Sequence, residues 1–258
     1  MPFTLSHAAA ALPLRRLKLE WSAFLIGSMA PDFPYIVGNT DYRSLGHAFP
    51  GVIEFTLPVS ILALWVFHVA IKRPASTLLP KGVRQRLQGQ LGAFKFGGPA
   101  RFLAILFSIV LGIATHLAWD TLTHPLNWLW RRWAWMQKVV KFPVIGSVPM
   151  YEALQYGSSL IGLAALGIWV LLWYRKTAPA PLAGTANGNS GPLIALSMIA
   201  VATVAGFIRA ELVIGTPKNL DMADSFLFVF GVTGIALAFW QVLIYCIMIS
   251  SHQTWTLS

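Results

Sequence analysis

Five long apolar runs constrain this chain more than any other feature of its sequence. A helix needs about 20 apolar residues in succession to cross a lipid bilayer, where no water can satisfy its backbone polar groups. The runs that reach about this length span residues 51–71, 102–123, 150–174, 193–214 and 226–249. We therefore predict an all-α fold, a polytopic helical membrane protein with about five transmembrane helices.

The N-terminal part is predicted to be helical without spanning the membrane. Residues 6–19 favour a helix, but they are too few to cross a bilayer. Residues 21–37 are apolar and are interrupted by Pro31, Asp32 and Pro34. A pair of interfacial or re-entrant half-helices fits this stretch, and it places Asp32 at a helix end beside a wet or protein-filled cavity.

The charge of the chain also fits a membrane protein. Only 11% of its 258 residues are charged, against about 25% in an ordinary soluble domain. The net charge is +10, but the basic residues gather at the ends of the apolar runs, where lipid head groups account for them. We expect membrane lipids as partners, no nucleic acid, and the bacterial cytoplasmic membrane as the location. The sequence does not specify the oligomeric state.

Composition divides the chain into three parts. Residues 1–176 are predicted to form a helical membrane domain that carries the candidate site, and residues 193–258 a C-terminal pair of transmembrane helices. Residues 177–192 are rich in Ala, Pro, Gly and Asn, which predicts a flexible linker. We expect the chemistry of the chain to lie in the first part.

Three potential metal ligands lie at the end of the run 102–123. His116, Asp120 and His124 follow one another at intervals of four residues, which stacks side chains on one helix face. Imidazole and carboxylate together suit zinc, manganese or iron, and the spacing does not choose among them. His124 precedes Pro125, which disfavours helical geometry and can take it off that face. In the alternative interpretation, His116 and Asp120 only cap, pair or reach interfacial water.

Other ionisable residues fall on the same side of the first spans. Because the runs 51–71 and 102–123 are antiparallel, the residues before the first meet the end of the second. The whole set is His7, Asp32, His47, Glu54, His116, Asp120 and His124. A mononuclear or dinuclear metal site needs such a mixture, and it would make hydroxide available near neutral pH. We expect catalytic roles for Asp120 and Glu54, with Glu54 as a general base or as a hydrogen-bond acceptor behind the ligands.

Several motifs together resemble a known family. In order, they are MPFTLSHAAAALPLRR, LIGSMAPDFPY, GHAFPGVIEFTLP, FHVAIKRP, GIATHLAWDTLTHP and MYEALQYGSSLIG, and they look like the DUF4184 family of bacterial membrane proteins over residues 1–162. The pattern of histidines and aspartates is also similar to the YdjM-like membrane-bound metal-dependent hydrolases, a group distantly related to the all-helical, zinc-dependent phospholipase C. The resemblance implies a divalent-metal site, with zinc expected first and manganese or iron as alternatives, formed by His7, Asp32, His47, His116 and Asp120.

Three hypotheses about function follow. The first is a membrane-bound hydrolase that cleaves an ester, with a phosphoester of a lipid or lipid-linked substrate as the expected class. It requires the five predicted ligands to converge within a few ångströms. The second is a transporter or permease that uses the same His and Asp residues to bind a proton or a metal ion. The third is a non-catalytic membrane scaffold in which these residues are structural. The single cysteine, Cys246, excludes a multi-cysteine metal site in all three.

Overall fold

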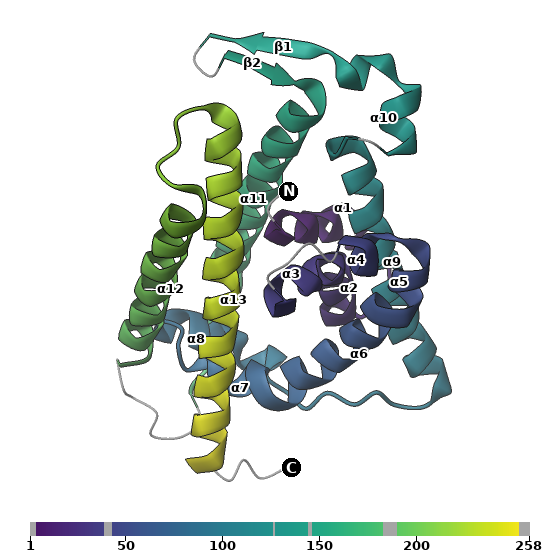
Figure 1. The fold of residues 1–258 in the computed structure, drawn as a ribbon. Helices are drawn as coiled ribbons and strands as arrows, with labels where there is room; N and C mark the ends of the chain where they lie inside the picture. The colour runs from purple at the N-terminus through teal and green to yellow at the C-terminus, as the bar shows by residue number, and fades with distance from the viewer. Residues whose placement is uncertain (1–3, 39–42, 126, 144–145, 183–189, 253–258) are drawn as a thin grey trace. The chain divides into compact units, whose positions relative to one another are not determined.

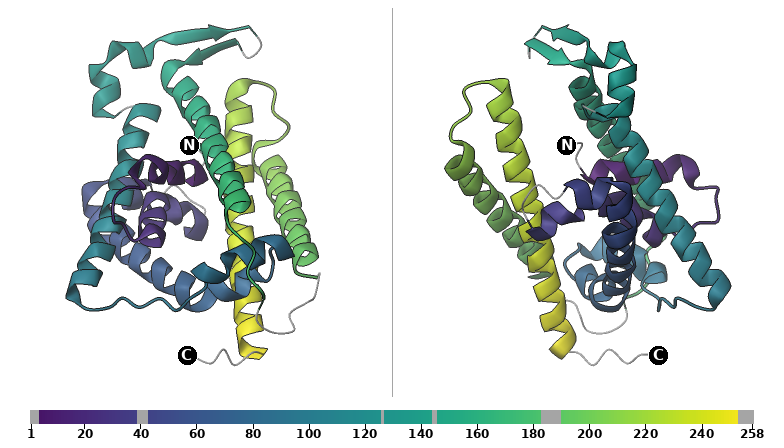
Figure 2. Two further views of the ribbon diagram at one scale, coloured as in Figure 1. Left: turned by 180° about the vertical axis from the view of Figure 1, so that it is seen from behind. Right: turned by 45° about the vertical axis from the view of Figure 1, so that its right-hand side comes forward.

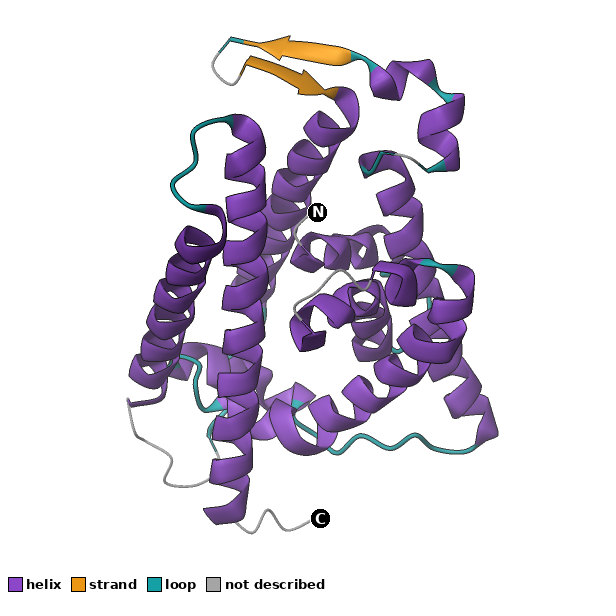
Figure 3. Ribbon diagram, in the orientation of Figure 1, coloured by secondary structure: helices purple, strands orange, loops and turns teal. Residues whose placement is uncertain are grey.

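The computed structural model describes residues 4–38, 43–125, 127–143, 146–182 and 190–252 (Figure 1). Most of these residues are helical, and the described part of the chain contains one short β-hairpin (Figure 3). Five helices within it are long and apolar enough to cross a membrane, and they span Phe49–Ser76, Pro99–Arg132, Met150–Lys176, Ser190–Ile214 and Leu220–Ser251. The predicted all-α, five-span membrane fold is therefore confirmed.

The chain folds into two compact units. The first comprises Met1–Phe33, Arg43–Leu64 and Phe96–Trp173, and the second Pro34–Tyr42, Trp65–Lys95 and Tyr174–Ser258. The domain boundaries proposed from the sequence stay a prediction, and residues 183–189 of the expected linker lie outside the described residues. Every residue of the predicted metal site belongs to the first unit.

Short helices make up the N-terminal part of the first unit. In chain order they are η1 (Thr4–Ala10), α1 (Ala11–Leu14), α2 (Trp21–Met29), η2 (Ala30–Asp32), α4 (Arg43–His47), α5 (Phe49–Gly51), η3 (Val52–Thr56) and most of α6 (Leu57–Val66), while α3 (Phe33–Gly38) continues into the second unit. The helix expected over residues 6–19 ends at Leu14, because the basic residues that follow are exposed and bury no apolar face. The interruption predicted after residue 21 is the 3-10 turn η2, which contains Asp32.

The long helix α9 (Pro99–Thr123) is packed against α2 in the first unit. Phe24 of α2 and Ile105 and Ile109 of α9 are fully buried. Gly27 and Gly112 allow the close approach, since a Cβ atom on either would collide with the backbone of the opposite helix. This contact brings the C-terminal end of α2 to the part of α9 that carries His116.

A small hairpin follows α9 in the first unit. The elements from α9 onward are α10 (Trp128–Arg132), η6 (Ala134–Gln137), β1 (Val139–Phe142), β2 (Gly146–Pro149) and α11 (Met150–Lys176). The two strands are antiparallel, with Val140 opposite Val148. The sequence analysis did not anticipate them, because strands of four residues are too short to give a clear alternation of apolar and polar residues.

The second unit is built around two long helices. Its elements are η4 (Phe67–Ile71), α7 (Lys72–Ser76), α8 (Lys81–Leu87), η5 (Gln88–Gln90), α12 (Ser190–Ile214) and α13 (Leu220–His252). Helices α12 and α13 lie side by side in both views of Figure 2 and are joined through Gly215, whose positive φ of 75° suits the end of a helix. Cys246 is fully buried, with its sulfur 3.8 Å from the carbonyl oxygen of Ile71.

Candidate metal centre

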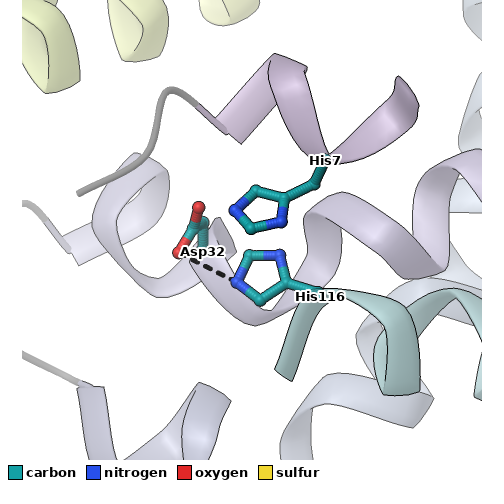
Figure 4. Close-up of side chains that lie close together, drawn as sticks. All are labelled: His7, Asp32 and His116. Carbon is teal, nitrogen blue, oxygen red and sulfur yellow. Dashed lines mark ion pairs between the residues drawn. The ribbon is translucent and has the colours of Figure 1, made fainter. Parts of the chain in front are cut away.

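Histidine and aspartate side chains from four elements of the first unit converge. Figure 4 shows three of them, His7 from η1, Asp32 from η2 and His116 from α9. His47, the last residue of α4, and Asp120, one turn beyond His116 on α9, complete the cluster. The structure thus brings together all five side chains that were expected to form a metal site.

Short distances join the donor atoms of His47, His116, Asp120 and Asp32. His47 Nε2 lies 3.3 Å from His116 Nε2, 3.1 Å from Asp120 Oδ2 and 3.7 Å from Asp32 Oδ1. His116 Nε2 lies 3.6 Å from Asp120 Oδ2 and 3.7 Å from Asp32 Oδ1. Ligands of a tetrahedral ion with bonds of about 2.0–2.2 Å are about 3.3–3.6 Å apart, so the donors of His47, His116 and Asp120 fit one such ion, and the Asp32 oxygen lies close to both histidines.

A backbone hydrogen bond fixes the protonation of His116. Its Nδ1 lies 2.8 Å from the carbonyl oxygen of Ser28 at the end of α2. A carbonyl can only accept, so Nδ1 carries the hydrogen, and in the neutral ring the lone pair is then on Nε2. Ligand histidines in metalloproteins are commonly oriented in this way. The Nε2 lone pair of His116 therefore faces the other donors.

Asp32 is oriented by a second hydrogen bond. Thr4 Oγ1 donates to Asp32 Oδ2 over 2.6 Å. This interaction occupies one carboxylate oxygen and leaves Oδ1 toward His47 and His116. Neither Thr4 nor the Ser28 carbonyl was predicted from the sequence. Thr4 lies one helical turn before His7, which is a weak signal, and a backbone carbonyl leaves no signal in the sequence at all.

A glycine permits the approach of His47. Gly46 precedes it in α4, and a Cβ atom at this position would collide with the backbone carbonyl of Pro31. Because Pro31 is followed by Asp32, the same close contact sets His47 beside that carboxylate. The Thr56 hydroxyl also lies 3.5 Å from the Gly46 carbonyl. The end of α4 is thus held against η2.

Burial shifts the pKa values of His7 and Asp32, which both lie outside the spanning helices. Burial, followed by the nearby His116, lowers the pKa of His7 to about 3, so its ring is neutral at neutral pH. Burial raises the pKa of Asp32 above its ordinary value, against the lowering effect of His116. Metal ligands must be unprotonated, and a bound divalent cation would favour the ionised carboxylate. A neutral His7 and a desolvated Asp32 therefore suit a cation at the centre of the cluster.

Several polar atoms of the cluster are buried without a hydrogen-bond partner. They are His7 Nε2, His47 Nδ1 and Asp120 Oδ1. Leaving such atoms unpaired costs about 1–3 kcal/mol each, so native proteins seldom bury them without reason. His7 Nε2 and Asp120 Oδ1 face each other at 3.6 Å, beyond hydrogen-bond distance. A bound cation would satisfy both atoms.

Glu54 does not join the cluster. It lies in η3, its side chain is exposed, and it makes no hydrogen bond or ion pair with any described residue. Glu54 was predicted to lie on the same side of the first spans as His47, as it would if one continuous helix carried both on one face, but α4 ends at His47 and a new helix starts at Phe49. The change of direction between the two helices breaks the shared face.

His124 stays close to the cluster after leaving the helix. It follows the last residue of α9 with extended backbone angles, φ −123° and ψ 146°, as expected before Pro125. Its side chain is nevertheless buried, and Nδ1 lies 3.6 Å from Asp120 Oδ1. The spacing of four residues alone could not decide whether His124 would stay close to Asp120 or turn away from it.

Comparisons with known proteins give one match. The family model described as "Domain of unknown function (DUF4184)" matches residues 1–247. No curated protein and no solved structure matches the chain. The further similarity to YdjM-like hydrolases stays a prediction.

Proposed function

Since the chain belongs to the DUF4184 family, a family of unknown function, we propose from the geometry of its cluster that it is a membrane-bound, metal-dependent hydrolase. His47, His116 and Asp120, together with Asp32, would hold a divalent cation, with zinc expected first and manganese or iron as alternatives. The observation that carries the proposal is the hydrogen bond from His116 to Ser28, because it turns a lone pair toward three other donors.

Such a cation supplies two capacities when it is bound. It lowers the pKa of a water molecule to about 7, and it stabilises negative charge that develops on an ester oxygen. The protein's part is to bind the ion with side chains that are largely shielded from bulk water. Asp120 acts in this proposal as a ligand. We assign no step to Glu54, because its side chain is exposed away from the cluster.

The position of the cluster favours a lipid substrate. His116 and Asp120 lie in α9, whose span Pro99–Arg132 is apolar enough to cross a membrane. A substrate with a lipid tail could keep that tail in the bilayer while its polar ester reached the site. This supports a phosphoester of a lipid or lipid-linked molecule as the substrate class, and the bacterial cytoplasmic membrane stays the expected location.

Metal content tests the proposal first. Elemental mass spectrometry on detergent-purified protein should find near-stoichiometric metal in the wild type and in Glu54→Gln, and a loss of it in Asp120→Asn and His116→Ala. The Glu54→Gln control also replaces a carboxylate but lies outside the cluster. Absence of metal from well-folded wild type, even after reconstitution with zinc, manganese or iron, would contradict the proposal.

Activity is then measured on the metal-loaded protein. The probes are p-nitrophenyl phosphate and mixed micelles that contain phosphatidic acid, with phosphate release as the readout and Asp120→Asn as the inactive control. Metal uptake into proteoliposomes, without hydrolysis of either probe, would favour the transporter hypothesis instead.

A further inference from the structure

The rings of His7 and His116 are stacked, and this limits how they can bind metal. Their centroids are 3.8 Å apart and their planes differ by 20°. The lone pair of an imidazole nitrogen lies in the ring plane, so nearly parallel, stacked rings direct their lone pairs along separate lines. Within a metal–nitrogen bond length of about 2.0–2.1 Å these lines do not meet. Donor atoms of His7, Asp32 and His116 lie within 4.8 Å of one another, but one ion would not be in the plane of both rings.

The first ion leaves two buried donors unused. The first ion takes His47 Nε2, His116 Nε2 and Asp120 Oδ2, with Asp32 Oδ1 3.7 Å from both histidines. His7 Nε2 and Asp120 Oδ1 remain, 3.6 Å apart and without a hydrogen-bond partner. The side chains of His7 and Asp120 are only 1% and 7% exposed, so bulk water does not pair these atoms.

We propose that the cluster binds two divalent cations, with the second held between His7 Nε2 and Asp120 Oδ1 and with the carboxylate of Asp120 bridging the two ions. This inference rests on the proposed function. His124 Nδ1 lies 3.6 Å from the same Asp120 oxygen, but it also lies 3.2 Å from the backbone carbonyl oxygen of Asp120. A carbonyl can only accept, so this nitrogen carries the hydrogen and does not serve as a ligand.

A second ion changes the chemistry of the site. The first ion would be held by His47, His116 and Asp120, with the Asp32 oxygen 3.7 Å from both histidines. The second would have two protein donors, His7 and Asp120, so it would keep open positions for water or for a substrate oxygen. Paired ions about 3.5–4 Å apart are suited to in-line displacement at phosphorus, where they hold the attacking and the leaving oxygen. A second ion therefore favours phosphoesters among the ester substrates of the proposed function.

Metal stoichiometry separates this inference from the proposed function. We expect full-length wild type equilibrated with Zn²⁺ to bind two ions per chain, His7→Phe to bind one, and Asp120→Asn to lose both. Phenylalanine keeps an aromatic ring over His116 but offers no donor. The control is His68→Phe, since His68 is also stacked on an aromatic ring, that of Phe94, but lies in the second unit. It should retain two ions.

A spectroscopic readout on the wild type does not depend on a variant folding. Wild type loaded with two equivalents of Mn²⁺ should give the electron paramagnetic resonance signal of an exchange-coupled pair, and His7→Phe the signal of an isolated ion. One bound ion in both proteins, with no coupling, would overturn the second site and leave the proposed function standing. No bound ion in wild type would overturn both.

Discussion

Asp120 is the residue on which the cluster depends, because its two carboxylate oxygens face different imidazoles. Oδ2 lies 3.1 Å from His47 Nε2 and 3.6 Å from His116 Nε2. Oδ1 lies 3.6 Å from both His7 Nε2 and His124 Nδ1. No other side chain of the described cluster contacts four histidines. Residues around Asp120 orient the other metal-binding side chains, and the contribution of each to metal affinity or stability can be measured with a single variant.

The hydrogen bond from Thr4 should strengthen metal binding. Replacing Thr4 with Val removes the donor to Asp32 Oδ2 but keeps the side-chain shape. We expect Thr4→Val to weaken metal affinity about 10-fold or more, as is typical when a group that orients a ligand is lost. Competition with a chelating dye measures the affinity. Thr4→Ser keeps the hydroxyl and should bind like wild type, whereas equal affinity of the Val and wild-type proteins would show that Asp32 needs no orientation.

His7 should make the metal-free protein sensitive to acid. Its pKa in the folded state is about 3, below the ordinary 6.5, so between these values only the unfolded chain takes up the proton. Stability is therefore lost as pH falls below 6.5, by up to about 1.4 kcal/mol per pH unit from this residue. The raised pKa of Asp32 has the opposite effect on stability as the pH falls. This effect is present in both wild type and His7→Phe, so a comparison of the two proteins isolates the effect of His7.

The measurement compares unfolding temperatures of wild type and His7→Phe, both in chelator, at pH 7 and pH 4.5. We expect the wild type to lose more stability over this interval than the variant does. Parallel pH dependence in the two proteins would mean that His7 is not held neutral by burial.

At the scale of elements, the crossing of α2 and α9 positions the first ligand. Gly27 and Gly112 bring the two backbones together, and the Ser28 carbonyl then reaches His116 Nδ1 at 2.8 Å. The same feature recurs where Gly46 lets α4 approach η2. Two close backbone contacts thus place three ligands, His116, His47 and Asp32, that come from different elements.

Gly112→Ala should therefore weaken both folding and metal binding. A methyl group would collide with backbone atoms of Phe24 and Ser28, which cannot move aside without shifting α2. We expect a loss of about 1–3 kcal/mol in stability, the usual cost of overpacking, together with lower metal occupancy. Unfolding temperature and elemental analysis are the measurements.

The matched control is Gly157→Ala in α11, where an added methyl group meets nothing within 4 Å. It should keep wild-type metal content and be as stable as wild type or slightly more so, since alanine favours a helix over glycine. If both alanine variants behaved alike, the helix crossing would not control the site.

At the scale of the whole molecule, the site links segments that are remote in the chain. Residues 7, 32, 47 and 116–120 all contribute buried polar atoms to one place in the first unit. A cation that binds there stabilises the folded state over the unfolded chain, which lacks an assembled site. Metal binding and the folding of this unit are therefore expected to be coupled.

Chelation should lower the unfolding temperature of the purified protein. At 100 times its dissociation constant a ligand stabilises the fold by about 2.7 kcal/mol, and chelator removes this contribution. Thermal unfolding with and without chelator measures the shift. Asp120→Asn should show no shift, and an equal shift in that variant would mean that the stabilising metal binds elsewhere.

The sequence by itself determined the features that depend on local patterns. Apolar runs of about 20 residues fix the spanning helices, because a bilayer demands that length whatever the tertiary structure. The four-residue spacing placed His116 and Asp120 on one face of α9, and Pro125 ended that helix at Thr123. Family motifs marked the histidines and aspartates that were expected to meet.

Only the tertiary structure decided which donors converge and how they are oriented. The chain directions between η1, η2, α4 and α9 bring His7, Asp32 and His47 to His116, and they leave Glu54 exposed. The stacking of His7 on His116 and the carbonyl of Ser28 arise from contacts across about 90 to 110 residues of chain. Hydropathy and spacing describe neighbours along a helix, whereas these contacts depend on how closely two backbones can cross.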